Sequence, residues 1–177
     1  SCDTALLNRQ ALTFRLLSVG FVYPTDSWQS RLDRLIAQLD HGAIFPAPKS
    51  SREELQVEHF WLFGPNPACP LELSYHLTEN PFEQARLMSQ MSGFHCAFGV
   101  EAQDGMRPDH LSIVLEFLSI LCLKLANASE QNILEKQEIT KKALQAYVKE
   151  FLTPGLEAFS GKLKAKAQES FYKKWSE

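Results

Sequence analysis

Three residues near the middle of the chain have side chains suited to acid–base or metal chemistry: Asp109, His110 and Glu116. On a helix, Asp109 and Glu116 share one face, whereas His110 lies about 100° round from Asp109. No further histidine or cysteine stands nearby at metal-ligand spacing. The sequence also lacks a nucleophile elbow, a P-loop and a GxGxxG fingerprint. A small metal- or nucleotide-dependent hydrolase using these three residues is therefore one hypothesis without a supporting motif.

The same residues belong to a long apolar stretch, Pro108–Ala126, in which leucine, isoleucine, valine and phenylalanine cover nearly every side of a helix. Such a helix is typically buried. Pro108 suits a first helical turn, and Asp109 favours the positive end of the helix dipole. Polar residues recur along one narrow face, at Asp109, Ser112, Glu116 and Ser119. We predict a central helix whose polar stripe is either its only wet side or the floor of a binding groove.

A second unusual stretch is WLFGPNPACPLELSY, residues 61–75, where apolar residues and prolines crowd a connection between two helices. Prolines at this density exclude a continuous helix. Gly64 is typical of a helix C-cap, and the prolines of a rigid turn. Long connections in compact domains are often functional. With Glu72 and Tyr75 beside the apolar residues, the stretch is typical of one wall of a peptide groove.

The elements that must position these residues are helices, because no segment alternates at period two for long enough to be a strand. Asp3 or Thr4, the Ser51/Glu54 capping box and Asn80–Pro81 indicate helix starts. Gly42, the NASEQN segment and Thr153–Pro154–Gly155 indicate helix ends. We predict an all-α, single-domain bundle over residues 1–177, with about seven main helices around the buried central one. Their ranges are 4–23, 28–39, 51–63, 80–99, 108–126, 133–151 and 156–175.

Composition limits the class of protein. The chain has 177 residues, 45% hydrophobic and 22% charged, as in ordinary globular proteins. The apolar stretch is interrupted by Glu116 and Lys124, so we expect no stable membrane insertion. No export signal opens the sequence, and the four cysteines form no CxxC pair or zinc motif. We therefore expect free thiols and a cytoplasmic location.

The net charge of −3 is unevenly distributed. Ten acidic residues and two arginines lie between Glu53 and Glu116, whereas nine lysines and seven acids lie between Glu130 and the last residue. One interpretation is a set of solvated faces; the other is that the middle of the chain attracts a basic partner. Nucleic acid is disfavoured as a partner because no basic stripe is interleaved with aromatic residues.

The motifs resemble those of one known family. The LFG of Leu62–Gly64, the PLELSY of Pro70–Tyr75, and Pro108–Asp109–His110 opening a DHLxxxLEFL helix are similar to the TorD/DmsD/NarJ family of molybdoenzyme-specific redox enzyme maturation chaperones. The resemblance extends over most of the chain. It departs at Thr153–Pro154–Gly155, where many relatives have a Trp-Leu-Pro-like sequence.

The resemblance implies a cytoplasmic chaperone that is not an enzyme and has no cofactor of its own. Its partner would be a precursor molybdoenzyme catalytic subunit, bound through its N-terminal region, often a twin-arginine leader peptide. The chaperone would assist cofactor insertion, folding and export proofreading. GTP binding has been proposed in the family, and this sequence gives no independent support for it. The resemblance is compatible with a monomer or with a domain-swapped dimer hinged near NASEQN.

A leader peptide presents arginines followed by an apolar stretch. Carboxylates bind guanidinium groups bidentately, and apolar walls accept the rest. Two alternatives remain open: His110 as a capping or packing residue, and Glu116 as a structural carboxylate. A generic helical adaptor or oligomerisation domain is the competing function. The predicted peptide-binding residues are Trp61, Leu62, Phe63, Gly64, Pro70, Glu72, Tyr75, Pro108, Asp109, His110 and Glu116.

Overall fold

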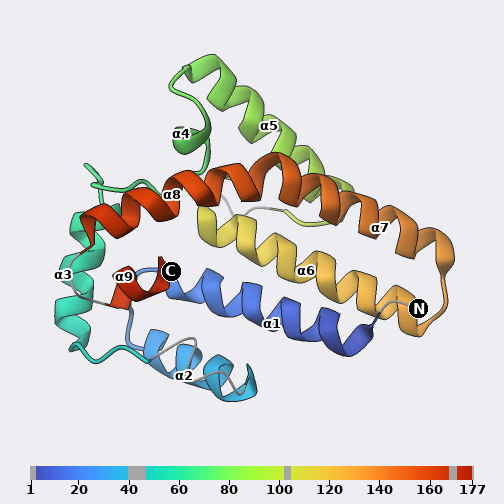
Figure 1. Cartoon of the computed structure of the whole chain (residues 1–177), viewed down its shortest axis with the longest axis horizontal. Helices are drawn as coiled ribbons and strands as arrows, with labels where there is room; N and C mark the ends of the chain where they lie inside the picture. Colours follow the sequence, from blue (N-terminus) through green and yellow to red (C-terminus); the bar gives the residue numbers. More distant parts are fainter. Residues whose placement is uncertain (1–2, 40–46, 102–104, 168–170, 177) are drawn as a thin grey trace.

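The computed structural model describes residues 3–39, 47–101, 105–167 and 171–176. Within these ranges the regular structure is helical, and the β pairing consists of one isolated bridge, so the all-α prediction is confirmed (Figure 1). The helices are α1 Thr4–Gly20, α2 Trp28–Leu39, α3 Arg52–Phe63, α4 Ser74–Leu77, α5 Pro81–Ala97, α6 Leu111–Glu130, α7 Leu134–Tyr147, the π-helical turn η1 Val148–Leu152, α8 Thr153–Lys166 and α9 Phe171–Trp175.

The central helix is α6, which lies between α1 and α7. We predicted that Pro108 and Asp109 form its first turn, and this is wrong: α6 begins at Leu111, with His110 as its N-cap, and both residues precede it. Two of the stripe serines face α1. The Ser119 hydroxyl donates to the Ala11 carbonyl at 2.8 Å, and the Ser112 carbonyl accepts from Ser18 at the same distance. Much of the polar stripe is therefore in contact with α1, although Ser112 and Glu116 also line a cleft beside it.

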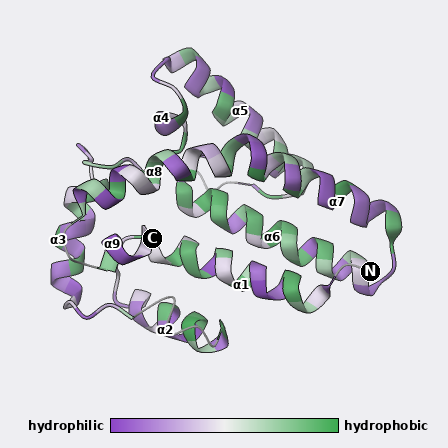
Figure 2. Cartoon of the chain, viewed as in Figure 1, coloured by the Kyte–Doolittle hydropathy of each residue, from purple (hydrophilic) through white to green (hydrophobic). Residues whose placement is uncertain are grey.

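By length and composition, α6 is sufficient to cross a membrane, even with Glu116 and Lys124 in its sequence. We expected these two charged residues to exclude a membrane-spanning helix, but two charges are too few to exclude one by composition. Most of the helix is nevertheless buried within the bundle, which is the environment of a core helix in a soluble fold. Figure 2 shows the contrast between a largely hydrophobic α6 and a largely hydrophilic α7.

Helix starts follow the predicted capping residues. Ser51 and Glu54 form a reciprocal capping box at α3, with the Glu54 amide donating to Ser51 and the Ser51 amide donating to Glu54. Asn80 caps α5 by accepting from the Phe82 amide at 2.9 Å, and Pro81 occupies the first turn. Asp3 caps α1 by accepting from the Leu6 amide. These local signals are sufficient because a cap satisfies orphan backbone amides without tertiary help.

Helix ends follow the sequence less closely. Thr153–Pro154–Gly155 does not stop a helix, because the π-helical turn η1 joins α7 to α8 and the Thr153 amide donates to the Val148 carbonyl. The central helix continues to Glu130, and the predicted NASEQN break is confined to Gln131 and Asn132, where Asn132 has a φ of 54°. Gly42, the predicted end of α2, lies outside the described residues.

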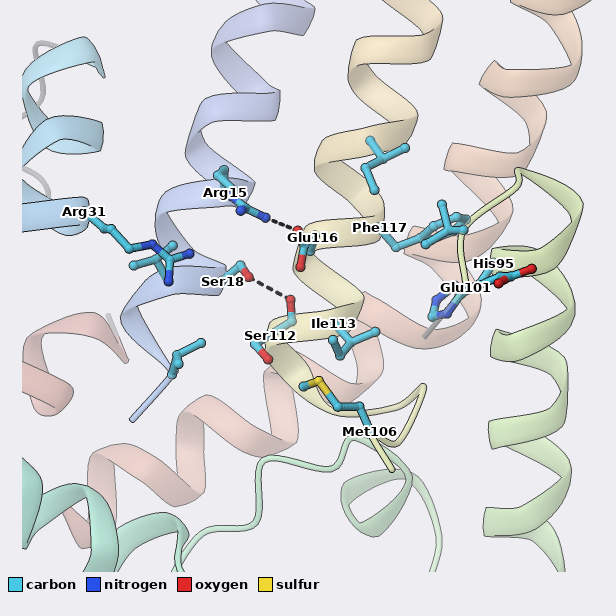
Figure 3. Close-up of a pocket in the computed structure, with 14 residues that line it drawn as sticks. Arg15, Ser18, Arg31, His95, Glu101, Met106, Ser112, Ile113, Glu116 and Phe117 are labelled. Atoms are coloured by element: carbon cyan, nitrogen blue, oxygen red, sulfur yellow. Dashed lines mark hydrogen bonds and ion pairs between the residues drawn. The ribbon is translucent and has the colours of Figure 1, made fainter. Parts of the chain in front are cut away.

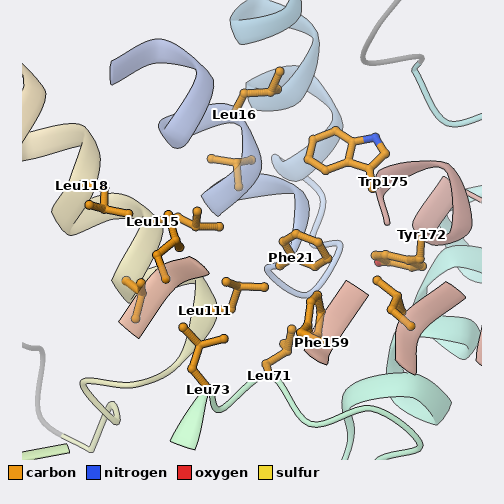
Figure 4. Close-up of a cluster of buried hydrophobic side chains, with 14 of the residues drawn as sticks. Leu16, Phe21, Leu71, Leu73, Leu111, Leu115, Leu118, Phe159, Tyr172 and Trp175 are labelled. Atoms are coloured by element: carbon orange, nitrogen blue, oxygen red, sulfur yellow. The ribbon is translucent and has the colours of Figure 1, made fainter. Parts of the chain in front are cut away.

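The last predicted helix is two elements. Ala167 ends α8 in an extended conformation, and α9 turns back so that Tyr172 and Trp175 enter the core (Figure 4). Phe21, which follows α1, makes edge-to-face contacts with Phe159 and Trp175, with ring centroids 5.5 and 6.2 Å apart. The α9 helix therefore covers one end of the α1–α6 core.

Gly20 tests this packing. A Cβ added at Gly20 would lie 2.0 Å from a ring carbon of Trp175, whereas one added at Gly93 in α5 would meet nothing within 4 Å. We predict that Gly20→Ala lowers the free energy of unfolding by about 1–3 kcal/mol, because overpacking must displace the ring. Gly93→Ala, the control, gains up to about 1 kcal/mol of helix propensity. Urea unfolding measures both, and equal stabilities for the two variants would contradict the described packing.

Candidate functional site

The two sequence motifs that are far apart in the chain lie side by side in space. The Leu73 amide donates to the Asp109 carbonyl at 2.9 Å, and the Leu111 amide donates to the Leu71 carbonyl at 2.8 Å. This pair of bonds forms the antiparallel bridge between Glu72 and His110. The structure therefore joins the Pro70–Tyr75 and Pro108–His110 segments directly, just before α4 and α6 begin.

Asp109 is the buried centre of this junction, with no exposed surface. Its carboxylate accepts two hydrogen bonds from the Arg107 guanidinium, both at 3.0 Å, and one from the Ser74 hydroxyl at 2.5 Å. The Ser74 amide adds a fourth bond at 3.3 Å. Burial opposes ionisation of Asp109, but the bonds from Arg107 and Ser74 outweigh it and hold its pKa below the ordinary value. The site therefore contains a buried, fully paired carboxylate.

Arg107 carries the charge of the junction toward the surface. Its guanidinium lies over the Tyr75 ring, 4.9 Å from the centroid, and donates to the Tyr75 hydroxyl at 3.3 Å. The bonds to Asp109 raise the pKa of Arg107. The Tyr75 ring is therefore positioned by Arg107, which Asp109 holds in turn, and 45% of the residue remains exposed.

His110 is the N-cap of α6. Its Nδ1 accepts from the Ser112 amide at 3.3 Å and lies 2.7 Å from the Ser112 hydroxyl. An accepting Nδ1 places the ring proton on Nε2. Burial lowers the pKa of His110, against the opposing effects of Glu72 and Asp109, so the ring is neutral at physiological pH. Of the alternatives for His110, the structure therefore shows the capping residue of α6.

The LFG motif at the end of α3 divides between core and surface. Leu62 is fully buried, and Phe63 packs edge-to-face on Phe21 and Tyr172. Gly64 ends the helix where a Cβ would lie 2.3 Å from the Phe60 carbonyl oxygen. Trp61 is half exposed. Trp61, which immediately precedes the motif, therefore places a large apolar side chain at the surface.

Val57 and Phe60, which were not among the predicted peptide-binding residues, extend the apolar surface beside Trp61. Val57, Phe60 and Trp61 follow the i, i+3, i+4 spacing of one helix face and are 72%, 63% and 50% exposed. We call this surface the α3 face. The i, i+3, i+4 spacing is present in the sequence, but no sequence feature indicates that this side of the helix stays exposed.

Glu116 lies apart from the junction, in a cleft of about 270 Å³ between α1, α6 and the loop that carries Met106 (Figure 3). It forms an ion pair with Arg15, and both side chains are about two-fifths exposed. Ile113 and Met106 supply apolar lining, and His95 lies at the cleft wall. No sequence signal connected Arg15 or Met106 with Glu116, because their proximity arises from helix packing alone.

The positions of Asp109, His110 and Glu116 do not support the hydrolase hypothesis, which requires the three side chains to act together. Asp109 is bonded to Arg107, His110 to Ser112, and Glu116 to Arg15, so the three side chains are directed to different partners. Across the described ranges no group of three or more histidine, cysteine or carboxylate residues is arranged to hold a metal ion.

The Asp109–Arg107 pair yields a stability prediction. Asp109→Asn removes the negative charge opposite the Arg107 guanidinium, which is only 35% exposed. We therefore expect the free energy of unfolding to fall by about 2–3 kcal/mol, less than for a fully buried pair. Because folding lowers the pKa of Asp109, its contribution is complete above the unfolded value of about 3.9 and is lost as pH falls through the folded value. The difference from wild type should therefore shrink at about pH 3.

Asp26→Asn is the matched control, since Asp26 is 93% exposed and also pairs with an arginine, Arg52. Its effect at pH 7 should stay below about 1 kcal/mol. Urea unfolding of both variants at the two pH values measures this. Equal losses for the buried and exposed aspartates would contradict the assigned role of Asp109.

Comparison with known proteins agrees with this architecture. A solved structure from Archaeoglobus fulgidus, proposed to be a redox enzyme maturation protein, superposes with a TM-score of 0.65 at 19% sequence identity and covers 94% of this chain and 88% of its own. At that identity the likeness shows the fold alone. No curated protein matches the chain. The family model of the nitrate reductase delta subunit matches residues 25–164. This chain therefore belongs to the nitrate reductase delta subunit family, whose membership indicates a maturation chaperone for a redox enzyme.

Proposed function

We propose that this chain is a cytoplasmic chaperone that binds the leader or N-terminal region of a molybdoenzyme catalytic subunit while that subunit folds and receives its cofactor. Family membership supports the general role. The observation that carries the finer proposal is the α3 face, an exposed row of Val57, Phe60 and Trp61. Monomeric proteins seldom leave aromatic residues grouped on the surface unless they bind something.

The chemistry of the α3 face matches that of a leader peptide. The aromatic rings of Phe60 and Trp61 offer a large apolar area to the apolar stretch of a leader. In the first turn of the same helix, Glu54 accepts from the Ser51 amide, and Glu53, 3.4 Å from the Arg52 guanidinium, is the carboxylate that a leader arginine would engage in place of Arg52. An acidic and aromatic helix face is thus complementary to both parts of the peptide.

We assign the junction residues different roles in this binding. Tyr75, half exposed, is a contact residue, and Glu72, beside His110, is a carboxylate for a leader arginine. Asp109 has no exposed surface, so it positions Arg107 and Tyr75 and does not itself touch the peptide. Glu116 contributes only where a leader arginine replaces Arg15 in the cleft.

The partner is tested by co-purification. The tagged chain is isolated from its native cells, and the proteins retained are identified by mass spectrometry. Recovery of a molybdoenzyme catalytic subunit with its N-terminal region intact supports the proposal. Recovery of the chain alone at several salt concentrations would overturn the chaperone proposal and would favour the adaptor hypothesis.

The binding surface is tested with a synthetic peptide of that subunit's N-terminal region. Phe60→Ala and Trp61→Ala should each weaken binding about tenfold or more, because truncating an aromatic hot-spot residue typically costs more than 1 kcal/mol. Fluorescence anisotropy with a labelled peptide measures the Kd. Phe82→Ala is the control, since Phe82 is 86% exposed on α5, outside the α3 face. If all three variants bind as the wild type does, the α3 face is not the site.

A further inference from the structure

A second hollow lies at the end of the bundle away from α3, where α7 and the start of α1 flank the last turns of α6 (Figure 1). Its volume is about 940 Å³, and its lining includes Leu125 of α6 together with Leu134, Lys141 and Gln145 of α7. A shallower hollow of about 390 Å³ continues along the same helix from Gln145 to Thr153. The two hollows meet at Gln145 and follow one side of the same helix, and together we call them the α7 groove.

The length of the α7 groove suits a helix. From Leu134 to Thr153 the α7–η1–α8 helix is unbroken, which at the rise of an α-helix is about 28 Å, or about five turns. The lining residues follow one side of this helix, whose α7 and α8 parts are inclined to one another (Figure 1), and a row of that kind accepts the apolar face of a second helix. The larger hollow, lined by α6, α7 and Asp3, is concave, which disfavours a flat membrane surface as its occupant.

The groove has an apolar base. Leu125 is buried at its floor and packs with Leu7 of α1. Leu144 and Val148 are partly buried in the shallower section, and Leu134 at the groove's end is 76% exposed. An exposed leucine on an otherwise hydrophilic helix marks a place where an apolar side chain of a partner gains contact.

The charges along the groove are predominantly positive and in part unpaired. Lys142 pairs with Glu138 at 2.9 Å, and Asp3 at the groove's end already accepts from the Leu6 amide. Within the described ranges no ion pair engages Lys141 or Lys149, which line the two sections of the groove. Free ammonium groups beside leucines favour a ligand with carboxylates beside an apolar face.

We propose that the α7 groove binds an amphipathic helix of a protein partner, one that is apolar on one face and acidic along its edges. This site is separate from the α3 face, and its charge is opposite: the α3 face suits a basic leader, whereas the α7 groove suits an acidic helix. The proposal does not depend on leader binding, so either can fail without the other.

A pair of designed peptides tests the α7 groove. The first is an 18-residue amphipathic helix with leucines on one face and glutamates along both edges; the second has lysines in place of the glutamates. Anisotropy of the labelled peptides gives the Kd for the full chain and for Lys141→Glu/Lys149→Glu. We expect the glutamate peptide to bind the wild type and to lose about tenfold or more in affinity with the double variant, which replaces attraction by repulsion. The lysine peptide should show the reverse preference.

Lys136→Glu is the matched control, because Lys136 is exposed on the same helix but lines a different cavity, beside Phe98. It should leave the affinity for the glutamate peptide within about twofold. Equal binding of both peptides, no binding of the glutamate peptide, or equal losses in both variants would overturn the proposal. So would binding of the chain to phosphatidylglycerol vesicles that depends on Lys141 and Lys149, which would assign the lysines to a membrane. Concentration-dependent dimerisation abolished by the double variant would instead assign the groove to a second copy of the chain.

Discussion

The buried carboxylate of Asp109 is the constraint on which the candidate site depends. An ionised group with no exposed surface is stable only when its acceptor positions are occupied, and here Arg107 and Ser74 occupy them from two different segments. Each partner is held in turn: Arg107 by Tyr75, and Ser74 at the start of α4. One charge therefore fixes the relative position of the chain before α4 and the chain before α6.

Two exposed surfaces of the bundle, the α3 face and the α7 groove, carry different charged residues. Acidic side chains accompany exposed aromatic residues on α3, whereas lysines accompany exposed and partly buried leucines on α7. The sequence already contained this asymmetry, as an acidic middle and a lysine-rich end. Folding does not separate the two charges completely, because α9, which carries Lys173 and Lys174, packs on α3 through Tyr172 and Phe63. The α3 face and the α7 groove nevertheless lie toward opposite ends of the bundle, with α6 between them. Partners of opposite charge can then bind without competing.

Local signals were predictable from the sequence, and contacts between helices were not. Capping at Ser51 and Asn80 is decided within four residues, so it was predicted correctly. The apolar coverage of α6 likewise identified the core helix. The ion pair of Glu116 with Arg15 joins two helices and depends on how α1 and α6 pack. The helical repeat of apolar residues within each helix does not predict that packing. The family motifs identified the junction segments, but burial of Asp109 became visible only when Arg107 and Ser74 were in place.

The error at Thr153–Pro154–Gly155 shows how a strong local signal is overruled. Pro154 lacks the amide that would bond to the Glu150 carbonyl, but Glu150 is exposed, so water can satisfy that carbonyl. The π-helical bond from Thr153 to Val148 carries the helix past the proline. Gly155 then has a packing role and not a terminating one: a Cβ there would lie 3.1 Å from Leu73, the residue that bonds to Asp109 through its backbone. The apparent helix breaker therefore lets α8 close over the junction, and the helix continues from α7 into α8 with a change of direction.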